Sequence, residues 1–150
     1  MKSLFEMVGD FHRKFGLGVA GESEPLPKDL DDGTFLFRYQ FLLEELHELL
    51  AAHRAGDVAG VADALADLVY VALGTAHLAG IPFDRVFAEV QRANLSKERS
   101  LGTSDSRGKR SSALDVVKPE GWLPPDVRGV IQRVAAERHE RLVLECGNAH

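Results

Sequence analysis

A chain of 150 residues, 45% hydrophobic and 27% charged, predicts one soluble globular domain that can bury its own core. Its net charge of −5 argues against a nucleic-acid-binding surface, and its single cysteine, Cys146, excludes an internal disulfide or a cysteine-rich zinc site. Residues 1–15 alternate charged and apolar side chains, so we expect no signal peptide. The most apolar window, residues 64–83, contains Asp67, His77 and Gly80, so we expect a buried helix rather than a membrane span, and a cytoplasmic protein.

The N-terminal segment predicts one helix followed by a loop. Apolar side chains recur at helical spacing over residues 4–15, with Ser3 available as the N-cap and Gly16 as the stop. Residues 16–33 contain two prolines and show no periodicity, which indicates a loop long enough to be functional.

Three further helices follow in close succession. The second is predicted over residues 34–55, and the third begins after the N-cap Asp57 and ends at Gly80. Asp84 is the predicted cap of the fourth helix, which runs to about residue 97. Because no segment alternates as a strand does, the chain is predicted to be all-α.

The C-terminal part has a different composition. Residues 100–112 are rich in glycine, serine and basic side chains, which is typical of a flexible loop. An extended turn at residues 119–125 carries Trp122, and a last helix is predicted over about residues 126–145. We expect residues 1–150 to form a single domain.

Three glutamates give the second helix an unusual face. At 100° per residue, Glu44, Glu45 and Glu48 share one side of the helix with Phe37 and Phe41. A face that mixes carboxylates with phenylalanines is not an ordinary solvated face, although the glutamates alone would also suit one.

The third helix contains two aspartates in apolar surroundings. It is apolar nearly all round and is therefore expected to be buried, and its Asp63 and Asp67 lie four residues apart on one face. A buried, unpaired carboxylate is costly, and only Arg38 offers an obvious cationic partner. Oxygen ligands without cysteine predict Mg²⁺, with Mn²⁺ as a possible substitute.

Glu44-x-x-His47 offers a second metal alternative, since it matches half of a di-iron carboxylate site. The chain has no second Glu-x-x-His, so another copy of the chain would have to supply it. His47 also falls away from the carboxylates on the helical wheel, which favours the Mg²⁺ alternative.

The fourth helix ends in residues suited to phosphate. Asn94 and Lys97 are three residues apart, so both can face one ligand, although such a pair is also common on an ordinary surface. Further basic residues follow at Arg107, Lys109 and Lys118. Carboxylates for a cation together with cationic donors for phosphates suit metal-assisted hydrolysis of a phosphoanhydride.

Three motifs carry a family resemblance. Glu45-x-x-Glu48, DALADLVYVALGTAHLAGI at residues 63–81 and VFAEVQRANLSK at residues 86–97 resemble the all-α nucleoside triphosphate pyrophosphohydrolases. That superfamily includes MazG, phosphoribosyl-ATP pyrophosphohydrolase and the dimeric dUTPases. With KPEGW at residues 118–122, the chain is most similar to short MazG-like proteins.

The resemblance implies a MazG-like helical bundle whose four-helix core is completed by dimerisation, as a homodimer or a dimer of dimers. It also implies metal ligands at Glu45, Glu48 and Asp67, with Glu44 as a further ligand or as the base that positions water. Ala64 stands where the family has an acid, so Asp63 is expected to substitute. Asn94 and Lys97 would contact the substrate phosphates and Lys97 would stabilise developing charge, with Arg38, Lys118, Arg107 and Lys109 as further substrate-binding residues.

The implied reaction is hydrolysis of a nucleoside triphosphate to the monophosphate and pyrophosphate, in nucleotide-pool house-cleaning and with dUTP as one candidate substrate. The loop at residues 100–112 could order over the triphosphate as a lid. Two alternatives stay open: a phosphoribosyl-ATP pyrophosphohydrolase, and a non-catalytic helical dimer that binds a nucleotide or a partner. Neither nucleic acid nor a membrane is an expected partner.

Overall fold

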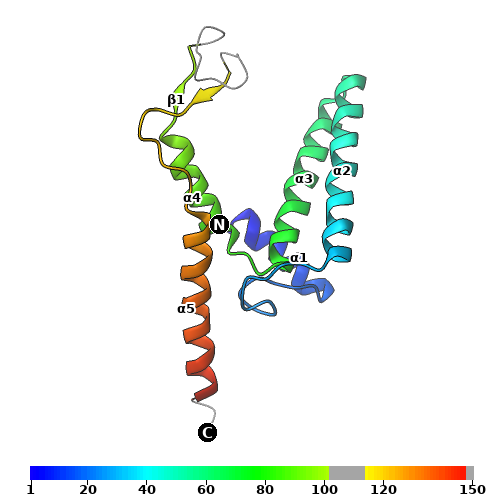
Figure 1. Ribbon diagram of the computed structural model, residues 1–150. Coiled ribbons are helices and arrows are strands. Elements are labelled where there is room, and N and C mark those ends of the chain that lie inside the picture. Colours follow the sequence, from blue (N-terminus) through cyan, green and yellow to red (C-terminus); the bar gives the residue numbers. More distant parts are fainter. Residues whose placement is uncertain (102–113, 148–150) are drawn as a thin grey trace. The chain divides into compact units, whose positions relative to one another are not determined.

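The computed structural model describes residues 1–101 and 114–147, and these contain five helices and one pair of short strands (Figure 1). The chain groups into two compact units, one made of Met1–Phe83 with Arg133–His150 and the other of Asp84–Gln132. The predicted all-α class is confirmed. The single domain over residues 1–150 stays a prediction.

The first helix, α1 (Leu4–Phe15), has the predicted boundaries because both are set by local chemistry. The Ser3 hydroxyl accepts a hydrogen bond from the Glu6 backbone N–H, and the Glu6 carboxylate accepts one from the Ser3 N–H. This reciprocal pair satisfies two donors that the helix leaves free. At the other end Gly16 adopts a left-handed conformation with φ of 67°, which terminates the helix.

Helices α2 (Asp32–Ala55) and α3 (Val58–Leu78) form an antiparallel hairpin (Figure 1). The turn between them consists of Gly56, which is left-handed with φ of 70°, and Asp57, which caps α3 by accepting from the Gly60 N–H. Asp57 is therefore confirmed as a cap. Helix α2 begins two residues before the predicted start, because Asp31 rather than a later residue caps it.

The core of the first unit lies where α1 packs on the C-terminal half of α3. Residues 24–28 also run against the end of α3, where the Lys28 N–H donates to the Ala79 carbonyl. Gly80 makes this approach possible, since a Cβ there would lie 2.5 Å from the Leu26 carbonyl oxygen. The buried side chains of this unit include Val8, His12, Val19, Leu73, Ala76, His77, Ala79 and Val134.

The expected burial of the third helix is wrong for the single chain. The N-terminal half of α3 exposes large apolar side chains, among them Val58 at 81% and Leu65 at 50%, and α2 has no buried residue. By length and composition α3 is also apolar enough to cross a membrane, a test that core helices of soluble proteins pass as well. Periodicity shows that a face is apolar, but it does not show that the same chain covers it.

The second unit contains most of α4 (Phe83–Leu95), strands β1 (Glu98–Arg99) and β2 (Val116–Val117), and the start of α5 (Val127–Gly147). The prediction of Asp84 as the cap of α4 is wrong, because α4 begins at Phe83 and Asp84 lies in its first turn. An acidic side chain in the first turn also interacts favourably with the positive end of the helix dipole. The sequence therefore does not distinguish an acid at the N-cap from an acid in the first turn.

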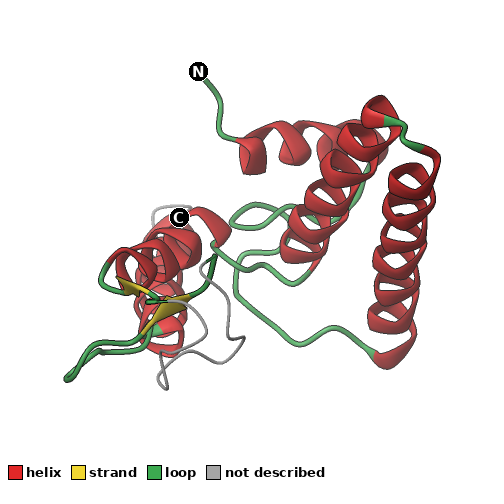
Figure 2. Ribbon diagram, turned by 90° about the horizontal axis from the view of Figure 1, so that it is seen from above, coloured by secondary structure: helices red, strands yellow, loops and turns green. Residues whose placement is uncertain are grey.

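Strands β1 and β2 pair antiparallel, with Glu98 opposite Val117 and Arg99 opposite Val116 (Figure 2). These strands are not predictable from the sequence pattern, because two residues are too few to show alternation and the two strands lie far apart in sequence. The 119–125 turn is free of helix and strand as predicted, and α5 starts directly after Asp126.

Candidate functional site

The α2–α3 hairpin places the predicted carboxylates on neighbouring helices. We call Glu44, Glu45 and Glu48 of α2 with Asp63 and Asp67 of α3 the acidic cluster. Burial raises the pKa of the Glu45 carboxyl, and the negative charges of the other four members raise it further. This shared electrostatic effect shows that the hairpin brings the five side chains into one region.

Glu45 is the inner member of the acidic cluster. Its side chain is half-buried, and its Oε2 atom is covered from solvent without any hydrogen-bond partner. Glu44, Glu48, Asp63 and Asp67 are exposed around it. A covered carboxylate oxygen without a donor is costly, and a cation is one of the few groups that can satisfy it beside four further negative charges.

The acidic cluster is not a closed metal cage. Within residues 1–101 and 114–147, no three His, Cys, Asp or Glu side chains lie close enough together to hold a metal ion. Ala64, at the position where an acid was expected, is buried at 3% exposure, whereas Asp63 is exposed and acts electrostatically on Glu45. Asp63 is therefore the residue on this turn of α3 that is available to a cation.

Arg38 is held between the two helices rather than presented to solvent. Its Nη2 donates to the Val71 carbonyl over 2.8 Å, and its Nε donates to the Thr75 hydroxyl over 3.1 Å. The guanidinium also lies over the Phe41 ring, 5.5 Å from its centroid. These contacts tie α2 to α3, a role that the sequence analysis does not anticipate.

The predicted phosphate ligands of the second unit lie together. Helix α4 ends at Leu95, two residues earlier than predicted, and the Lys97 ammonium just beyond it donates to the Asn94 side-chain oxygen over 2.8 Å. Lys97 and Lys118 both lie over the Trp122 ring, 5.6 and 4.2 Å from its centroid. Two other predicted substrate-binding residues, Arg107 and Lys109, lie outside the described residues, as does most of the predicted lid.

Trp122 connects these cations to α4. Its indole Nε1–H donates to the Ala93 carbonyl over 2.8 Å. From the sequence, Trp122 is expected in the 119–125 turn and is one candidate for stacking on a base, but no contact with a lysine is predicted. The available signal is the spacing in KPEGW, which puts Lys118 four residues before the ring, but the approach of Lys97 depends on the pairing of β1 with β2.

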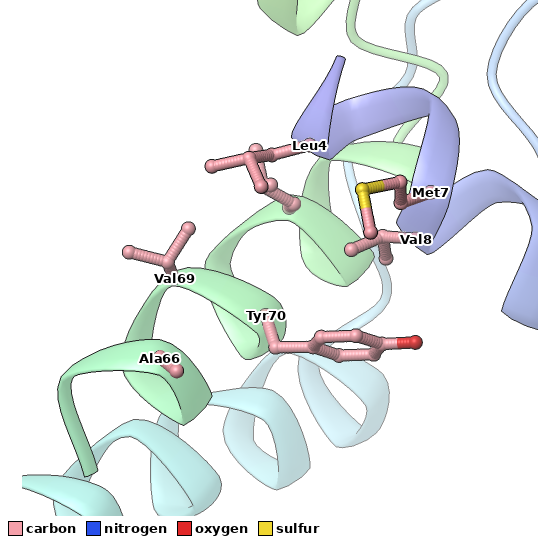
Figure 3. A pocket seen from close by; sticks show the side chains of 7 residues that line it. Leu4, Met7, Val8, Ala66, Val69 and Tyr70 are labelled. Atoms are coloured by element: carbon pink, nitrogen blue, oxygen red, sulfur yellow. The ribbon is translucent and has the colours of Figure 1, made fainter. Parts of the chain in front are cut away.

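An apolar groove of about 230 Å³ lies between α1 and α3 (Figure 3). The Tyr70 ring and the Met7 side chain face it from opposite helices in the close-up. Its lining residues are Leu4, Met7, Val8, Ala66, Val69, Tyr70 and Leu73. No charged side chain lines this groove, so it does not offer a place for phosphates.

Comparison with known proteins adds one finding. A protein-family model described as phosphoribosyl-ATP pyrophosphohydrolase matches residues 8–94, which is more than half of the chain. The match includes α1 from Val8 onward, the whole α2–α3 hairpin with the acidic cluster, and α4 as far as Asn94, and it ends before Lys97 and Trp122. A search of curated proteins finds no significant match.

Proposed function

The chain belongs to the phosphoribosyl-ATP pyrophosphohydrolase family, whose members hydrolyse a phosphoanhydride bond, and on that premise we propose phosphoribosyl-ATP as its substrate. In this reaction water attacks the phosphate chain, the bond between the α- and β-phosphates breaks, and pyrophosphate leaves phosphoribosyl-AMP behind. The family match favours this alternative over the triphosphate house-cleaning that the sequence analysis ranks first. The match with residues 8–94 is the observation that carries the proposal.

The acidic cluster fits the divalent cation that members of the family typically use. Its donors are all carboxylate oxygens, and the covered Glu45 Oε2 lacks a partner. We propose that Glu45, Glu48 and Asp67, which do not form a closed site on their own, come together around the cation when it binds, with Asp63 taking the place of the missing acid at Ala64. Such a cation, with Mg²⁺ the first choice, supplies polarisation of the phosphoryl oxygens and a lower pKa for the attacking water.

Side chains of this protein can accept the proton of the attacking water and bind the phosphate chain. Glu44 is exposed beside Glu45 and can accept the proton of the attacking water. Asn94 and Lys97 offer an amide and an ammonium to the phosphate chain, and Lys118 offers a second ammonium. These cationic donors stabilise the negative charge that develops on the leaving pyrophosphate.

We further propose that the protein acts as a dimer through the exposed faces of α2 and α3. Phe35 and Leu36 of α2 and Leu65 and Val69 of α3 each expose between 45% and 59% of their surface. A water-exposed apolar surface of this extent on both helices of a hairpin is typical of an interface. Two copies of the hairpin would complete a four-helix bundle.

Pyrophosphate release tests the proposed function directly. The protein is incubated with Mg²⁺ or Mn²⁺ and with phosphoribosyl-ATP, ATP, dUTP and dCTP, and the products are separated. We expect pyrophosphate and phosphoribosyl-AMP from phosphoribosyl-ATP, and loss of this release in Glu48→Gln but not in the matched control Glu140→Gln, an exposed glutamate of α5. Preferential release from a nucleoside triphosphate would instead restore the house-cleaning alternative.

A further inference from the structure

In the second unit, two lysine ammonium groups share one indole ring. Lys118 Nζ lies 4.2 Å and Lys97 Nζ 5.6 Å from the centroid of Trp122. The pairing of Glu98 with Val117 brings them there, because Lys97 and Lys118 directly adjoin this pair at the ends of β1 and β2 and lie opposite each other in the same antiparallel register. Like charges directly opposite each other on paired strands repel, so this arrangement has a cost.

Trp122 is held in place independently of either lysine. Its Nε1–H donates to the Ala93 carbonyl at the end of α4, a carbonyl that the helix itself leaves without a backbone partner. The turn that carries the ring is fixed at its far end, where the Glu89 carboxylate accepts from the Asp126 N–H over 2.8 Å. The indole is thus fixed by contacts of its own, and each ammonium group lies within about 6 Å of its centroid.

The two positive charges are not neutralised by acids. Among the described residues, no carboxylate lies within 4.0 Å of either ammonium, and the polar partner of Lys97 is the uncharged Asn94 oxygen. The electron-rich face of the indole offsets part of the repulsion. An anion with several charged oxygens, such as a pair of phosphates, can meet both ammonium groups at once.

We propose that Trp122 is a positioning residue for the phosphate chain of the substrate: its ring holds Lys97 and Lys118 side by side, so that both contact the same pair of phosphates. This inference rests on the proposed function and extends it to a residue beyond the family match at 8–94. A point charge on a flexible stem gains affinity when its position is fixed before binding, and the indole provides this fixation.

Fluorescence provides a test that does not depend on catalysis. Trp122 is the only tryptophan of the chain, so its emission reports this ring alone. Titration of the protein with pyrophosphate is expected to give a saturable change in emission, because binding moves the charges that lie against the ring. The change should be lost in Lys118→Gln and kept in Arg128→Gln, an exposed cation of the same unit. No saturable change at low ionic strength would overturn the proposal.

Steady-state kinetics with phosphoribosyl-ATP provides the second test. Trp122→Leu removes both the aromatic face and the hydrogen bond, whereas Trp122→Phe keeps the face. Loss of one fixed ammonium contact is expected to raise KM about tenfold in Trp122→Leu, with a smaller effect on kcat and a partial rescue in Trp122→Phe. Circular dichroism verifies that each variant is folded at the assay temperature. An unchanged KM in a folded Trp122→Leu variant would overturn the proposal.

The two tests separate the inference from the proposed function. Pyrophosphate binding that changes the Trp122 emission without hydrolysis of phosphoribosyl-ATP supports the lysine arrangement and contradicts the proposed substrate. Hydrolysis of phosphoribosyl-ATP with the same KM in wild type and Trp122→Leu supports the substrate and contradicts the role of Trp122.

Discussion

His12 and His77 lie in the core of the first unit with their ring centroids 5.2 Å apart, and each ring is tied to a backbone carbonyl. His12 Nδ1 is 2.6 Å from the Gly18 oxygen, and His77 Nε2 is 2.9 Å from the Phe5 oxygen. Burial lowers the pKa of His12, and the neighbouring His77 and Arg38 add to this effect against the opposing hydrogen bond to Gly18. Burial therefore favours the neutral form of the His12 ring in the folded protein.

This depressed pKa predicts that the protein loses stability in mild acid. Unfolded His12 takes up a proton near pH 6.5 and folded His12 only at lower pH, so below 6.5 the unfolded chain binds more protons. The free energy of unfolding should then fall as pH is lowered, by at most about 1.4 kcal/mol per pH unit for one proton. Urea unfolding between pH 8 and pH 5 measures this slope. It should be smaller in His12→Asn and unchanged in His53→Asn, an exposed histidine.

Replacing Arg38 tests whether this residue links α2 to α3, as its contacts show, or binds the substrate phosphates, as predicted from the sequence. Arg38→Met removes the hydrogen bonds to Val71 and Thr75, and we expect a loss of about 1–3 kcal/mol in the free energy of unfolding. Urea denaturation measures the loss. If stability were unchanged and only the KM for the substrate rose, Arg38 would be a phosphate ligand, as the sequence analysis proposes, and not a link between helices.

The helix boundaries were predictable where a single cap determines them. Ser3, Gly16 and Asp57 satisfy backbone groups of their own helices, so a few neighbouring letters are enough to place them. Asp84 shows the limit, because an acid is favourable both at the cap and in the first turn. The pair of short strands was not predictable, since its two halves are far apart in sequence and each is only two residues long.

Neutralising Glu45 tests the acidic cluster as a cation site. In Glu45→Gln the repulsion from four neighbouring carboxylates disappears, so without metal the variant should be at least as stable as wild type. With Mn²⁺ or Mg²⁺ at a hundred times its dissociation constant, wild type should gain about 2.7 kcal/mol and Glu45→Gln much less. Thermal unfolding with and without metal measures both effects, and Glu140→Gln is the matched control. An equal gain in both proteins would place the cation elsewhere.

Because α3 exposes apolar side chains in the single chain, we expect these side chains to be part of the dimer interface. Leu65 is 50% exposed in the single chain, and a charge at this position would be buried between two copies. Leu65→Glu is therefore expected to be monomeric in size-exclusion chromatography with light scattering, whereas Leu144→Glu on α5 should behave as wild type. A monomeric wild type at micromolar concentration would contradict the dimer.

The carboxylates of the candidate site could be identified from the sequence, whereas the contacts of its cationic residues could not. Spacing along two helices identified the five carboxylates, and four of them act electrostatically on Glu45, but within the described residues they do not form a closed metal site. For Arg38 the sequence showed a cation on the correct helix, but not that Val71 and Thr75 of the next helix occupy its donors. Trp122 gains its role from Lys97, 25 positions earlier, and such a contact follows from tertiary structure alone.

The α2–α3 hairpin also has a consequence for the order of folding. All five carboxylates lie within one helical pair whose contacts are local, and local contacts form early. Their repulsion therefore opposes the first pairing of the two helices. A divalent cation present during refolding would neutralise the repulsion between these carboxylates. It should therefore increase the rate of the first folding step as well as stabilise the folded state.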